Sequence, residues 1–86
     1  MKIAERNLFK ASLHRLAEWE RLASLAQDAY DNDSMSEDCE EAVNHYYDLQ
    51  YNEFAYAVHL LCSASAGALS ETTCARIVNR MRRREE

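Results

Sequence analysis

The sequence has little of the material from which tight turns are built. It contains no proline and a single glycine, Gly67, among 86 residues. Because these two residue types form most hairpin turns, and glycine-rich loops cradle phosphates, their scarcity argues against turn-rich β folds and phosphate-binding loops. Long helices with few joints are the architecture that remains.

Long apolar runs are missing as well. The uninterrupted apolar stretches span only a few residues, far below the roughly 20 that a helix needs to cross a bilayer. The first six residues, Met1 to Arg6, carry charges where a signal peptide needs a continuous apolar segment. We therefore expect a cytoplasmic protein without membrane contact, folded as one domain over residues 1–86.

The cysteines do not suggest a disulfide framework. Cys39, Cys62 and Cys74 are odd in number and widely spaced, and each falls on the apolar side of a predicted helix. We expect them to be small buried hydrophobic residues.

Positive charge is absent from the middle of the chain. The net charge is −5, yet residues 1–30 and 67–86 are weakly positive, at +1 and +2. Residues 31–66 contain eight carboxylates and no lysine or arginine. A partner of this middle section is therefore expected to be basic.

Apolar residues recur at helical spacing in three segments. This spacing predicts helices over about 3–30, 35–66 and 71–84. Ser34 with Glu37 matches a capping box, Gly67 is suited to end the second helix, and Ser70 is suited to cap the third. The residues predicted to face the core are Phe9, Leu16, Trp19, Ala23, Ala26, Tyr30, Val43, Tyr47, Phe54, Val58, Leu61, Cys74, Ile77, Val78 and Met81.

These segments predict an all-α fold with two long antiparallel helices and a short third C-terminal helix. The long helices would each measure ~40–48 Å, which is long for a chain of 10.0 kDa. The apolar arc of the first helix is also wider than one neighbouring helix would cover. We therefore expect a homodimer that completes a helical bundle.

The sequence lacks the common motifs for catalysis, metal binding and cofactor binding. Gly-x-Ser-x-Gly, Walker and dinucleotide sequences are absent, and the histidines and cysteines lack the paired spacings of zinc and di-iron sites. Asp31-x-Asp33 begins like a calcium loop, but Ser36 replaces the required glycine and Ala42 the closing glutamate. We expect a protein that is not an enzyme and binds neither metal nor cofactor.

The segment from Ser70 to Asn79 resembles the recognition helix of helix-turn-helix repressors of the lactose-repressor type. The resemblance implies that small apolar positions are buried, here Cys74, Ile77 and Val78, and that polar positions face a DNA groove. The preceding turn is one residue longer than in that family, and Ser63 replaces a small alanine. The DNA-binding residues implied are Thr72, Arg76, Asn79 and Arg80, with Ala75 also facing the groove.

The acidic stretch supports the leading hypothesis. Carboxylates at a helix joint and a helix start are often only a solvated face, but together they also present an extended negative surface. We expect a non-enzymatic helical inhibitor or adaptor that docks this surface on a basic protein, including one that grips nucleic acid. Small acidic all-helical proteins of this style occur among phage-encoded anti-defence proteins such as anti-CRISPR proteins. The expected partner-binding residues are Asp31, Asp33, Glu37, Asp38, Glu41 and Asp48.

Two alternatives stay open at the level of sequence. One is a small DNA-binding transcriptional regulator that uses residues 70–80, and the other is a purely structural dimerisation module.

Overall fold

The computed structural model describes residues 2–32 and 37–85, and within them the chain forms three α-helices. They are α1 (Ile3–Asn32), α2 (Glu37–Ala64) and α3 (Glu71–Glu85). The predicted all-α fold and its helix boundaries are confirmed to within two residues. Ser34, the predicted cap of the second helix, lies outside the described residues.

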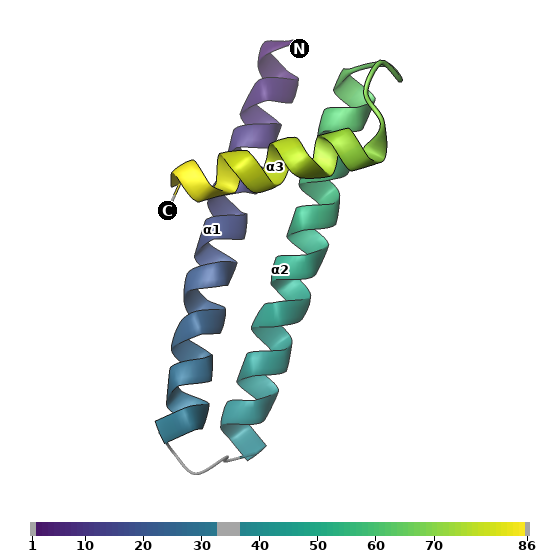
Figure 1. Ribbon diagram of the computed structural model, residues 1–86. Coiled ribbons are helices and arrows are strands. Elements are labelled where there is room, and N and C mark those ends of the chain that lie inside the picture. Colours follow the sequence, from purple (N-terminus) through teal and green to yellow (C-terminus); the bar gives the residue numbers. More distant parts are fainter. Residues whose placement is uncertain (1, 33–36, 86) are drawn as a thin grey trace.

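The two long helices lie side by side as an antiparallel hairpin, and α3 lies across it (Figure 1). The shorter helix crosses one face of the hairpin, passing over α2 first and then α1, toward the end that holds the N-terminus. The molecule extends 48 Å along the hairpin and is only 20 Å by 17 Å across. One half is thus a three-helix structure, and the other half is a bare two-helix hairpin.

The core lies where the three helices meet. Its buried residues come from α1, α2 and α3 in turn: Phe9, Leu13, Leu16, Ala57, Val58, Cys74 and Val78. In the two-helix half, Ala23 is the buried hydrophobic residue among those described. Burial of a large side chain stabilises the fold by roughly 1.5–3 kcal/mol, so the three-helix half contributes most of the stability.

The joint between α2 and α3 is formed by residues that are suited to end one helix and begin the next. Gly67 has a φ of 84°, in the left-handed region that glycine enters without steric cost, and Ala66 precedes it at 53°. The Ser65 hydroxyl donates to the Cys62 carbonyl over 2.8 Å. The Thr73 N–H donates to Ser70 Oγ over 3.2 Å, which confirms Ser70 as the cap of α3.

Some side chains lie differently from the prediction. Tyr47 was expected in the core and is instead 48% exposed, because α3 does not cover that part of α2. Cys39 and Cys62 are half-buried, whereas Cys74 is fully buried. Burial raises the pKa of the Cys74 thiol to about 11, so this thiol stays protonated at neutral pH and acts as a core residue.

Candidate interaction surface

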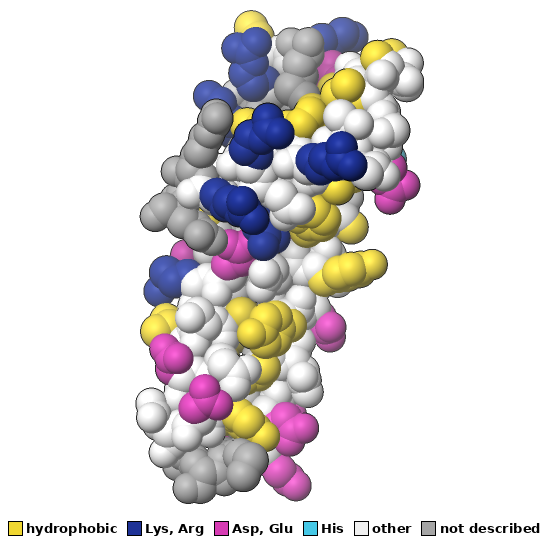
Figure 2. Space-filling model, in the orientation of Figure 1, with side chains coloured by type: hydrophobic (Ala, Val, Ile, Leu, Met, Phe, Trp, Pro, Cys, Tyr) yellow, Lys and Arg dark blue, Asp and Glu magenta, His cyan; other side chains and the backbone are white. Residues whose placement is uncertain are grey.

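The face that carries α3 is divided by charge along the long axis of the molecule. Figure 2 shows lysine and arginine side chains gathered over α3 and over the N-terminal turns of α1, with carboxylates gathered toward the opposite end of the hairpin. We call the first region the basic half. Its exposed cations are Lys2, Arg6, Lys10, Arg76, Arg80 and Arg83.

The acidic end surrounds the α1–α2 joint. Its exposed carboxylates come from the last turns of α1 and the first turns of α2: Asp28, Asp31, Glu37, Asp38, Glu40, Glu41 and Asp48. Gln27 donates a hydrogen bond to Asp31 over 3.0 Å. Five of the six predicted partner-binding residues therefore lie together and exposed, and the sixth, Asp33, lies outside the described residues.

Ion pairs in the described part of the chain hold three arginines away from the acidic end. Arg21 pairs with Glu18 on the same helix, and Arg82 pairs with Glu20 over 3.1 Å. Arg15 pairs with Glu53 over 2.8 Å. These three arginines are held by carboxylates outside the acidic end, so its negative potential reaches solvent.

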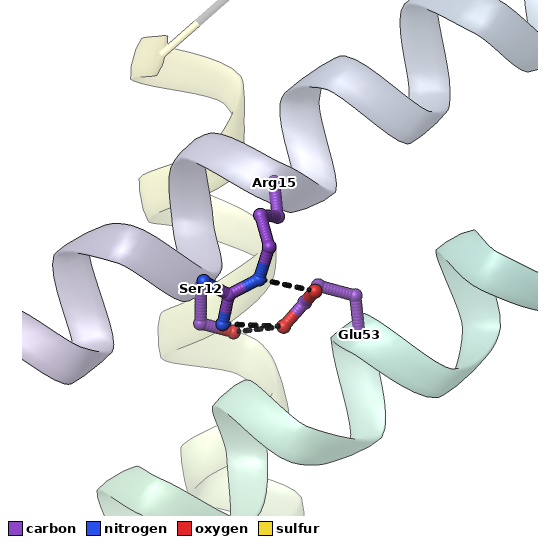
Figure 3. A network of polar contacts seen from close by, with 3 residues as sticks. All are labelled: Ser12, Arg15 and Glu53. Carbon is purple, nitrogen blue, oxygen red and sulfur yellow. Dashed lines mark hydrogen bonds and ion pairs between the residues drawn. The ribbon is translucent and has the colours of Figure 1, made fainter.

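Glu53 connects the two long helices through a small polar network (Figure 3). The hydroxyl of the fully buried Ser12 donates to its carboxylate over 2.7 Å, and Arg15 donates from Nε over 2.8 Å. Partial burial acts to raise the pKa of the Glu53 carboxyl, but the hydrogen bonds from Arg15 and Ser12 outweigh it and hold this pKa below its ordinary value. The network joins α1 to α2 and includes no residue of the acidic end.

An aromatic groove lies beside α3, on the two-helix half of the same face. We call it the tyrosine groove; Tyr47, Gln50, Tyr51 and Phe54 line it from α2, Glu20, Ala23 and Gln27 from α1, and Arg82 from α3. Tyr51 is 73% exposed. The Arg82 guanidinium lies 5.8 Å from the centre of the Phe54 ring while it pairs with Glu20. The groove thus accepts an arginine between an aromatic ring and a carboxylate.

Only some of the residues that the helix-turn-helix resemblance implies for DNA binding are exposed. Thr72, Arg76 and Arg80 are exposed, whereas Asn79 is half-buried. Ala75, which the resemblance places against DNA, packs against the core. The connection between α2 and α3 spans residues 65–70, longer than the roughly 3–4 residues of a helix-turn-helix turn.

Two features of this surface escaped the sequence analysis. Arg83 joins Arg76 and Arg80 on the outward side of α3, a pattern that the spacing of four and three residues could have revealed. The gathering of the α3 arginines with cations from the N-terminal turns of α1 (Figure 2) has no signal in sequence order, because it depends on where α3 crosses the hairpin.

The described residues include neither a cluster suited to a metal ion nor a helix suited to span a membrane. Among them, no group of three or more His, Cys, Asp and Glu side chains is placed to hold a metal ion. None of the helices they form is long and apolar enough to span a bilayer. In comparisons with family models, curated proteins and solved structures, nothing matches this chain.

Proposed function

We propose that this protein is a non-enzymatic, cytoplasmic interaction protein, an inhibitor or adaptor that docks its acidic end on a protein with a basic surface. The observation that supports this most directly is the exposure of the clustered carboxylates, most of which belong to a helix, α2, that has no lysine or arginine. A negative surface of this extent accelerates encounter with a basic partner and rejects acidic ones. Proteins that grip nucleic acid present such basic surfaces, in keeping with the phage-inhibitor analogy.

The test removes charge at the start of α2 without changing shape. The variant Glu37→Gln/Asp38→Asn/Glu41→Gln keeps each side chain's size, and it should lose only a few tenths of a kcal/mol of helix stability. A variant at the other end of the molecule, Glu5→Gln/Glu71→Gln, is the control. Each protein is used to capture partners from lysate of the native host after nuclease treatment, and the association rate of the captured partner is then measured.

The proposal expects the wild type and the control to retain a basic protein that the triple variant loses. The association rate should also fall as salt rises, since the Debye length is only about 8–10 Å near physiological ionic strength. Equal capture by the triple variant and the wild type would contradict the proposal and return the carboxylates to the status of a solvated surface.

DNA binding through α3 is a second candidate, supported by the outward position of Arg76, Arg80 and Arg83. If Arg76 contacts bases, Arg76→Ala should cost about 1–3 kcal/mol of binding free energy and relax sequence preference. Selection from a randomised duplex pool at low salt is the measurement, and failure to enrich any sequence would rule this candidate out.

The proposal includes a dimer. A half-molecule with two helices and one buried hydrophobic residue among those described leaves apolar surface uncovered, and a second copy is the simplest cover.

A further inference from the structure

We infer that the charge-divided face is a self-association surface on which two copies pair antiparallel, with α3 of each copy seated on the tyrosine groove of the other. This inference rests on the dimer in the proposed function and specifies its surface and orientation. It requires no particular docking partner, but a second copy and a basic partner would contact the same acidic end.

The face that carries α3 holds both a positively charged region and a negatively charged region. Its basic half and its acidic end lie at opposite ends of a 48 Å molecule. A twofold axis across this face, perpendicular to the hairpin, places the basic half of each copy over the acidic end of the other. Parallel pairing would instead set like charges against each other at both ends, which is unfavourable. Antiparallel pairing is also isologous and closes at two copies.

The outward side of α3 is suited to this contact. Arg83 follows Cys74 by nine residues, which is half a turn around the helix, so the arginines lie opposite the buried side. Because α3 begins over α2 and ends over α1, Arg76 of one copy approaches the α2 carboxylates of the other, including Asp48. Arg83 approaches those of α1, including Asp28.

The chain already uses this mode of contact once. Within a single copy, Arg82 reaches into the tyrosine groove, lies over the Phe54 ring and pairs with Glu20. Farther along the groove, Tyr47 and Tyr51 are exposed, with Asp48 between them in sequence. An arginine from a second α3 finds the same combination of aromatic ring and carboxylate there.

The size of the contact sets the strength of pairing. The uncovered stretch of the face is roughly 20 Å long at 1.5 Å of rise per residue, which places the interface near the low end of about 1,000–1,200 Å² for specific contacts. Pairing is therefore expected to be weak, and it should depend on salt because the contact joins charged groups. Asp38 lies half a turn around α2 from Tyr47, so it stays available to a basic partner.

The experiment is sedimentation equilibrium of the purified chain at several concentrations and salt levels, with circular dichroism to verify folding. The wild type should approach twice 10.0 kDa at low salt and dissociate as salt rises. Arg76→Glu alone and Asp48→Arg alone should each weaken pairing ten-fold or more. An equimolar mixture of the two variants should pair again, because each contact in the mixed dimer joins opposite charges.

Two tyrosine variants test whether pairing uses the tyrosine groove or another side of α2. Tyr51→Ala should weaken pairing ten-fold or more, whereas Tyr56→Ala, half a turn from Tyr47 on the opposite side of α2, should leave it unchanged. A wild type that stays monomeric throughout would overturn both this inference and the proposed dimer. A dimer that resists the charge changes, or fails to reform on mixing, would overturn the inference alone. A monomer that binds short duplex DNA through Arg76 would instead assign the basic half to nucleic acid.

Discussion

Replacing Glu53 with alanine tests whether its polar network holds the long helices together. The change leaves the Ser12 hydroxyl, which is 0% exposed, without the carboxylate that accepts its hydrogen bond, at a cost of about 1–3 kcal/mol. The Arg15 side chain is 46% exposed, so water replaces its ion pair and the loss adds at most about 1 kcal/mol. The free energy of unfolding should therefore fall by roughly 2–3 kcal/mol.

The measurement is thermal unfolding by circular dichroism at one fixed protein concentration. At about 4–8 °C per kcal/mol for a domain of this size, Tm should fall by roughly 10–20 °C. Ser12→Ala removes the orphaned hydroxyl, so the double variant Ser12→Ala/Glu53→Ala should be more stable than the sum of the single effects by about 1 kcal/mol. A Glu53→Ala protein as stable as the wild type, or strictly additive effects, would refute the reasoning.

The same network predicts a pH dependence. Because the folded-state pKa of Glu53 lies below the ordinary 4.5, its ionised form contributes stability that is fully present above that value and is lost as pH falls through the folded pKa. The stability difference between the wild type and Glu53→Gln should accordingly shrink as pH falls below 4.5. A difference that stays constant down to acid unfolding would contradict this assignment.

Four further substitutions test the fold by the same unfolding measurement. Leu16→Ala should cost about 2–5 kcal/mol because its side chain is fully buried, whereas Leu25→Ala, at a 52% exposed position, should stay within about 0.5 kcal/mol of the wild type. Ser70→Ala should cost about 0.5–2 kcal/mol through loss of the α3 cap, and a neutral result would show that Thr73 N–H needs no acceptor. Gly67→Ala should destabilise by about 1 kcal/mol, since φ is 84° there, and unchanged stability would contradict the left-handed conformation.

The helices could be predicted because their signals are local. Apolar periodicity over nearly thirty residues outweighs noise at single positions, and Gly67 and Ser70 mark a helix end and a helix start through backbone requirements of their own. Exposure of the acidic end was predictable for the same reason, since α2 has no lysine or arginine.

The rest depends on where α3 crosses the hairpin, which sequence order does not encode. Tyr47 and Val58 belong to the same apolar stripe of α2, yet Val58 is buried in the core with residues of α3, whereas Tyr47 is exposed. The crossing also decides that Arg82 turns inward to Glu20 while Arg83 remains exposed. Stripe membership therefore predicts which side of a helix is apolar, but not which part of that side is covered.

The uneven placement of the core has a consequence for motion on slow timescales. Amide hydrogens near Leu16 and Val58 should exchange with solvent only through large-scale unfolding, whereas those near Tyr30 and Val43 should need only local opening of two helices with little buried between them. Protection from exchange should therefore decline steadily toward the acidic end. If a second copy or a basic protein binds the acidic end, the amide hydrogens there should exchange more slowly than they do in the free protein.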